Sequence, residues 1–117
     1  MDEQTFKERT KKLALAVISM TETLPKTRSA DIIARQIIRS ATSIGANYRT
    51  ACRAKSTPDM LNKLKIVEEE SDETIYWLEL LQESKSAPDS AIAPLIKEAD
   101  EITAMTVASI KTIRLRK

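Results

Sequence analysis

Apolar residues recur at alternating three- and four-residue intervals along most of the chain. Proline and small polar residues interrupt this pattern at Leu24–Ser29, Arg53–Pro58 and Ser84–Ser90. Between these breaks the pattern predicts four amphipathic helices, over about residues 3–23, 30–53, 58–84 and 90–113. The alternating spacing favours bundle packing, and short connections make consecutive helices antiparallel neighbours. We therefore expect residues 1–117 to form one all-α domain, an antiparallel up-down-up-down four-helix bundle.

The expected core follows these intervals. It comprises Phe6, Thr10, Leu13, Val17, Met20, Leu24, Ala34, Ile37, Ala41, Ile44, Tyr48, Ala51, Met60, Leu64, Val67, Ser71, Thr74, Leu78, Leu81, Leu95, Ala99, Ile102, Thr106 and Ile113. Ser29 is the expected N-cap of the second helix. Thr57 is the expected cap of the third helix, with Pro58 at its first position. Pro94 is tolerated in the fourth helix because we expect it in the first turn.

Composition then narrows the possible functions. The chain has no histidine, one cysteine and one glycine, and 3% of its residues are aromatic. Ser-His and Cys-His nucleophiles, histidine metal sites and glycine-rich phosphate loops are therefore excluded. We expect no enzymatic activity, no catalytic residues, no metal and no cofactor. The longest apolar run, Leu13–Ile18, is far too short for a membrane span, and the N-terminus lacks a signal pattern, so we expect a cytoplasmic protein.

Charge is distributed unevenly. Residues 26–55 hold seven basic and one acidic side chain, whereas residues 56–84 hold two basic and eight acidic ones. On a helical wheel four arginines share one line, and we call them the arginine stripe: Arg35, Arg39, Arg49 and Arg53. Guanidinium groups suit bidentate contact with phosphate or carboxylate. The stripe is interpreted either as a nucleic-acid contact or as a solvated face that meets an acidic partner.

The third predicted helix carries the opposite charge. We call its shared negative side the acidic face: Glu68, Asp72, Glu79 and Glu83. A di-iron site of the bundle type would need histidines, so it is excluded. We expect the arginines of the second helix to neutralise this face, within the chain or from another subunit.

One stretch of the third helix is apolar on nearly all sides. Ile75–Leu81 contains a single charged residue, and Tyr76, Trp77 and Leu80 fall outside the inward positions. Because aromatic residues are enriched at interfaces, we interpret this stretch as a subunit contact; the alternative is that Trp77 only covers the side of the bundle. Opposed basic and acidic faces suit a head-to-tail contact, which can close into a ring.

Three residues near the end of the second helix leave alternatives open. Gly45 lies among small residues that permit close approach of a neighbouring helix. Asn47 is either a buried, register-fixing side chain or an exposed one. Cys52 is either a small buried apolar residue or a reactive thiol beside arginines.

The stretch from Arg39 to Leu81 resembles the bacterial four-helix bundle family also known as the 23S ribosomal RNA intervening-sequence proteins. The matching pieces are SIGANY (Ser43 to Tyr48), A-x-x-A-x-S from Ala51, K-L-x-I from Lys63 and E-x-x-E-T-x-Y-W-L (Glu70 to Leu78). The chain departs from the family at Thr50 and Glu69, where an acid and a lysine are common. The resemblance implies a homopentameric ring without enzymatic activity, associated with RNA or nucleoprotein.

Two functions remain in competition. The first is a ring-forming accessory protein that contacts RNA or nucleoprotein through the arginine stripe. The second is a protein–protein scaffold whose charged faces, including Glu68, Asp72 and Glu79, serve only subunit assembly.

Overall fold

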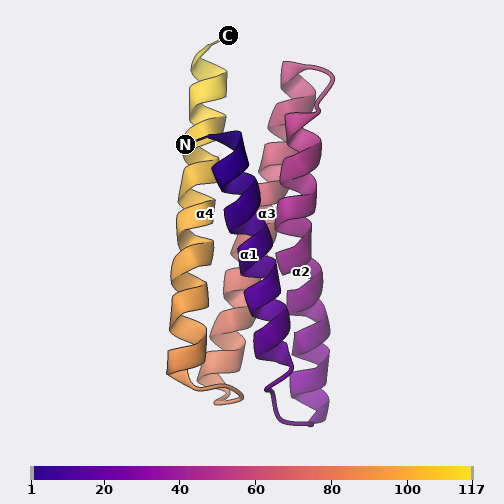
Figure 1. Ribbon diagram of the computed structural model, residues 1–117, viewed down its shortest axis with the longest axis vertical. Coiled ribbons are helices and arrows are strands. Elements are labelled where there is room, and N and C mark those ends of the chain that lie inside the picture. Colours follow the sequence, from indigo (N-terminus) through magenta and orange to yellow (C-terminus); the bar gives the residue numbers. More distant parts are fainter. Residues whose placement is uncertain (1, 117) are drawn as a thin grey trace.

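The computed structural model describes residues 2–116 as four α-helices: α1 (Glu3–Thr21), α2 (Arg28–Cys52), α3 (Thr57–Glu83) and α4 (Asp89–Leu115). Short loops join them, and the chain reverses direction at each loop (Figure 1). The bundle is 49 Å long and 21 × 20 Å across. The prediction of an all-α four-helix bundle is confirmed, with no strand among the described residues.

Most predicted core positions are buried. They include Phe6, Val17, Ile37, Ile44, Leu78 and Ile102, each at most 1% exposed. Six expected core residues are only half-buried: Leu24, Ala34, Tyr48, Met60, Leu95 and Ile113. Ala30, Ser40, Ala87, Ile92 and Ile110 are buried without having been expected. The periodicity therefore identifies the inward face of each helix and misses positions at the helix ends and flanks.

Two predicted helix caps are wrong by one or two residues. The N-cap of α2 is Thr27 instead of Ser29, and its hydroxyl accepts from the Ala30 backbone N–H at 3.2 Å. The N-cap of α3 is Ser56 instead of Thr57, and its hydroxyl accepts from the Asp59 N–H at 3.2 Å. In both loops two hydroxyl residues compete for the cap, and the one that satisfies a first-turn N–H prevails.

Pro94 lies deeper in α4 than predicted. The helix begins at Asp89, so Pro94 stands in the second turn rather than the first. Its missing N–H leaves the carbonyl of Ser90 without a helical partner. Because Ser90 and Pro94 are both exposed, water can satisfy that carbonyl and the helix continues.

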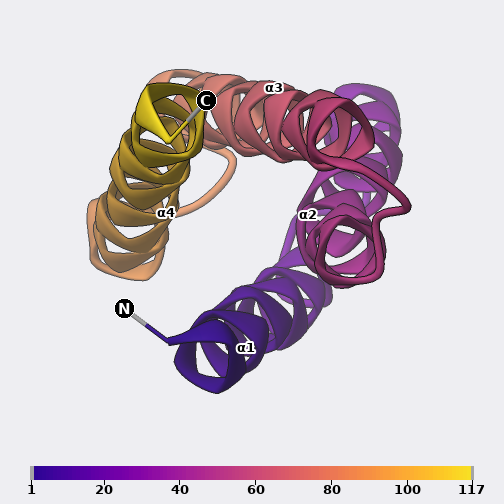
Figure 2. The same cartoon turned by 90° about the horizontal axis from the view of Figure 1, so that it is seen from above.

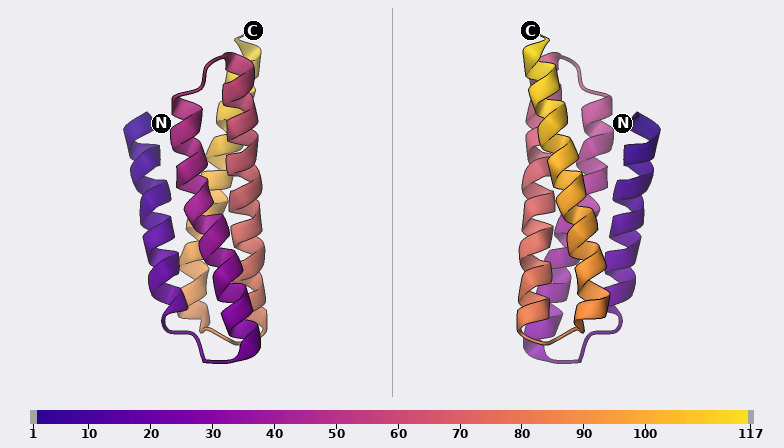
Figure 3. Two further views of the ribbon diagram at one scale, coloured as in Figure 1. Left: turned by 90° about the vertical axis from the view of Figure 1, so that its right-hand side faces the viewer. Right: turned by 90° about the vertical axis from the view of Figure 1, so that its left-hand side faces the viewer.

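The helices follow one another round the bundle in chain order (Figures 2 and 3). α2 packs most extensively on α3, α3 on α4, and α1 mainly on α2, whereas α1 and α4 contact each other least. Hydroxyl pairs join the three tightly packed helices: Thr74 Oγ1 donates to Ser40 Oγ at 2.9 Å, and Ser71 and Thr103 share a bond of 2.7 Å. α2, α3 and α4 thus form the rigid side of the bundle.

Candidate nucleic-acid and subunit interfaces

The arginine stripe lies on the outer side of α2. All four of its arginines are exposed. Arg35 Nη2 meets Asp31 Oδ2 at 2.7 Å, with side chains 77% and 60% exposed. Ion pairs this exposed contribute at most about 1 kcal/mol. Among residues 2–116 the other three arginines make no ion pair, so their charge is available to another molecule.

The acidic face lies on α3 and is mostly exposed. Asp72, Glu79 and Glu83 are exposed, and Glu68 is half-buried. Its one ion pair in the described part of the chain joins Glu68 to Lys65 on the same helix at 3.6 Å. No ion pair between residues 2 and 116 links α2 with α3. The first of the two expected sources, α2 arginines of the same chain, is therefore not observed, and neutralisation by arginines of another subunit stays a prediction.

The apolar stretch Ile75–Leu81 of α3 has a covered part and an exposed part. Trp77 and Leu80 are half-buried, and Trp77 packs against the core. Its Nε1 donates to Glu73 Oε2 at 3.1 Å. Tyr76 is 53% exposed and meets the Trp77 ring edge-on at 5.2 Å between centroids. Trp77 thus covers the flank of the bundle, while Tyr76 presents an aromatic surface beside the acidic face.

Asn47 and Cys52 lie near the end of α2, where each had two possible roles. Asn47 is half-buried, and its Nδ2 donates to the Ser43 carbonyl at 2.9 Å, within its own helix. It therefore makes no register-fixing bond to a neighbouring helix of the described chain. Cys52 is half-buried beside Tyr48, and burial raises the pKa of its thiol. The thiol therefore stays protonated at neutral pH, which does not favour a reactive cysteine.

A small cavity opens beside Cys52. α1 has 19 residues against 27 in α4, so it does not cover the whole length of the bundle. Beyond its N-terminus a cavity of about 160 Å³ is lined mainly by apolar side chains, among them Tyr48, Met60, Leu64 and Ile113. Burial raises the pKa of the Tyr48 phenol. The Tyr48 ring packs on that of Phe6, with 4.4 Å between the ring centroids.

Arg9 holds the otherwise loose side between α1 and α4. Its guanidinium donates twice to Glu98, at 2.9 and 2.6 Å, and once to Glu101 at 2.8 Å. These hydrogen bonds raise the pKa of Arg9, with Glu98 the larger cause. Within residues 2–116 this is the only ion-pair cluster that joins two helices. Sequence reasoning missed it, because the spacing of Glu98 and Glu101 shows an acidic pair on one helix face but not which helix packs against that face.

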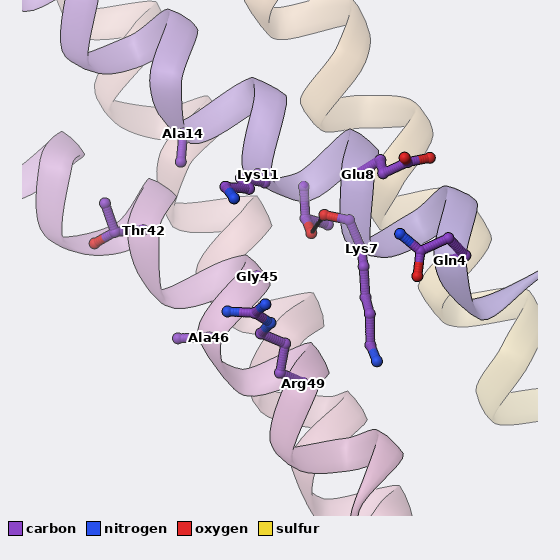
Figure 4. Close-up of a pocket in the computed structure, with 10 residues that line it drawn as sticks. Gln4, Lys7, Glu8, Lys11, Ala14, Thr42, Gly45, Ala46 and Arg49 are labelled. Carbon is purple, nitrogen blue, oxygen red and sulfur yellow. Dashed lines mark hydrogen bonds between the residues drawn. The ribbon is translucent and has the colours of Figure 1, made fainter.

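A groove runs between α1 and α2 (Figure 4). Its volume is about 520 Å³, and its lining residues are Gln4, Lys7, Glu8, Thr10, Lys11, Ala14, Thr42, Gly45, Ala46 and Arg49. The floor lies where the helices approach closely, since a Cβ on Gly45 would stand 3.1 Å from Thr10 Oγ1. The prediction that Gly45 permits close approach is confirmed. The groove brings Arg49 of the stripe opposite lysines of α1.

No helix within residues 2–116 is long and apolar enough to cross a membrane. In the same part of the chain, no group of three or more Asp, Glu, Cys or His side chains is placed to hold a metal ion.

Comparisons with known proteins agree with this architecture. A crystal structure of a protein of unknown function from the S23 ribosomal protein family of Bacteroides thetaiotaomicron is 32% identical. It superposes with a TM-score of 0.87 over 95% of this chain and 99% of the other. A comparison with curated proteins found no match. The model of the 23S rRNA-intervening sequence protein family matches residues 2–108. The chain therefore belongs to the 23S rRNA-intervening sequence protein family.

Proposed function

We propose that this chain is a non-enzymatic, cytoplasmic, up-down-up-down bundle that assembles into a homo-oligomeric ring and contacts RNA as an accessory protein. A homopentamer is the ring size that the sequence resemblance implies. The family description, which refers to 23S rRNA, supports RNA as the partner. The observation that carries the proposal is the exposed arginine stripe, three of whose members lack an ion-pair partner among residues 2–116.

Assembly draws on a different surface. The acidic face and Tyr76 lie on the outer side of α3, where they combine negative charge with an exposed aromatic ring. An aromatic anchor within a charged rim is typical of subunit contacts. In a head-to-tail ring each copy presents two different surfaces, so the α3 surface would meet another part of the next copy and leave the arginine stripe to RNA.

RNA binding is tested by a gel shift on the intact protein. Changing Arg35, Arg39 and Arg49 together to alanine should weaken binding of a labelled single-stranded RNA and flatten its dependence on salt concentration. The fold should persist, because exposed positions tolerate such changes. An unchanged gel shift, or no binding by the unmodified protein at low salt, would refute the RNA role.

The second candidate function is a scaffold in which both charged faces serve assembly alone. It is favoured by the absence of any ion pair between α2 and α3 within residues 2–116, which leaves each charge set complementary to the other on a second copy. Light scattering across a salt series distinguishes the two functions. If Arg39→Glu and high salt both dissociate the oligomer, the arginines serve assembly; if neither changes its mass, charge-mediated assembly is excluded.

A further inference from the structure

We propose that the α1–α2 groove is a phosphodiester-binding site, in which α1 supplies lysines opposite the arginine stripe and the RNA backbone lies between the two helices. This inference rests on the proposed function and extends it. It adds a second helix and three residues outside the stripe: Gln4, Lys7 and Lys11.

The charges in the groove favour a polyanion. Three cationic side chains line it, Lys7, Lys11 and Arg49, against the single carboxylate of Glu8. Lys7 Nζ already meets Glu3 Oε2 at 2.9 Å, whereas Lys11 and Arg49 make no ion pair among the described residues. In Figure 4 the Glu8 side chain points away from Arg49. Two unpaired cations therefore face the groove from opposite helices.

The small residues of the groove give an RNA backbone room to enter. Ala14, Gly45 and Ala46 leave its floor without bulky side chains, while the Gln4 amide adds a hydrogen-bond donor. Phosphate contacts need only cations and donors of this kind. A protein helix would need large apolar anchors, and none lines the groove. The lining therefore fits an RNA backbone better than the acidic face of a second copy.

Charge reversal at neighbouring lysines tests the site without touching the stripe. Lys11 lines the groove, whereas Lys12 is also exposed on α1 and does not line it. We expect Lys11→Glu to weaken binding of a fluorescein-labelled single-stranded RNA about tenfold in anisotropy titrations. The slope of log affinity against log salt should fall by about 0.7, the contribution of one phosphate contact. Lys12→Glu should change the affinity less than about twofold, because it removes only long-range attraction.

A second pair of variants alters the floor of the groove. Ala46 is exposed, so both substitutions should fold, which circular dichroism checks. Ala46→Glu adds a carboxylate to the groove lining that holds Lys11 and Arg49 and should weaken RNA binding about tenfold, whereas the equally large but neutral Ala46→Gln should weaken it less.

The outcomes separate this inference from the proposed function. If Lys11→Glu and Lys12→Glu behave alike while the arginine triple variant loses RNA, the groove site is refuted and the RNA role survives. If Lys11→Glu lowers the oligomer mass in native mass spectrometry, the groove is a subunit contact and the inference is wrong. If the unmodified protein binds no RNA, both fail.

Discussion

The two sides of α2 differ in kind. Towards α3 the helix presents a buried surface. Ile37, Ala41 and Ile44 are at 0% exposure, and the Ser40 hydroxyl accepts a hydrogen bond from Thr74. Towards α1 it presents Gly45, small residues and Arg49 around an open groove. The side towards α3 stabilises the fold, and these buried residues carry no charge. The side towards α1 costs stability through a glycine within a helix, and its Arg49 makes no ion pair among residues 2–116, so we expect function there.

We expect the largest effect from a substitution in the tightly packed core between α2, α3 and α4. Leu78 is fully buried in α3, and Leu78→Ala should lower the free energy of unfolding by about 3 kcal/mol because it leaves a cavity. Chemical denaturation measures this loss. A change below about 1 kcal/mol would show that the α2–α3–α4 core is less rigid than we describe.

A double-mutant cycle at the floor of the groove tests the close contact between α1 and α2. Gly45→Ala gains helix propensity, but its Cβ would stand 3.1 Å from Thr10 Oγ1. That hydroxyl is held by bonds to the Phe6 and Lys7 carbonyls, so Gly45→Ala alone should destabilise the protein. In a Thr10→Ala background the same substitution should stabilise it by about 1 kcal/mol. Equal effects in both backgrounds would refute the close contact.

The hydroxyl pair between α2 and α3 contributes less. Thr74→Val keeps the shape of the side chain and removes its hydroxyl, so it should cost about 1 kcal/mol in thermal or chemical unfolding. Thr42→Val is the matched control, because the exposed Thr42 hydroxyl bonds only within its own helix. Equal losses in the two variants would show that the bond to Ser40 contributes nothing beyond the local one.

The smallest effect on stability belongs to the stripe. Arg39→Ala removes an exposed side chain without an ion pair among residues 2–116 and should change the free energy of unfolding by less than about 0.5 kcal/mol. RNA binding should nevertheless weaken. A loss of stability comparable to that of Leu78→Ala would mean that Arg39 is part of the folding core rather than of a binding surface.

Sequence periodicity predicted the four helices and most of the core because the inward side of a helix leaves a regular pattern. The pattern could not decide which hydroxyl residue caps α2 and α3, since Thr27 and Ser29, like Ser56 and Thr57, can all accept a hydrogen bond from a first-turn N–H. The outward direction of the stripe followed from wheel arithmetic on one helix. The Arg9 cluster and the groove could not be predicted in this way, because they depend on which side of α1 meets α2 and which meets α4.

Native mass spectrometry of the purified protein, with and without nuclease, tests most directly whether the arginine stripe and the acidic face contact other molecules. We predict a discrete homo-oligomer after nuclease treatment, at five times the 13.1 kDa chain mass, and additional nuclease-sensitive mass without treatment. A single 13.1 kDa species under both conditions would contradict the assembly and the RNA contact together.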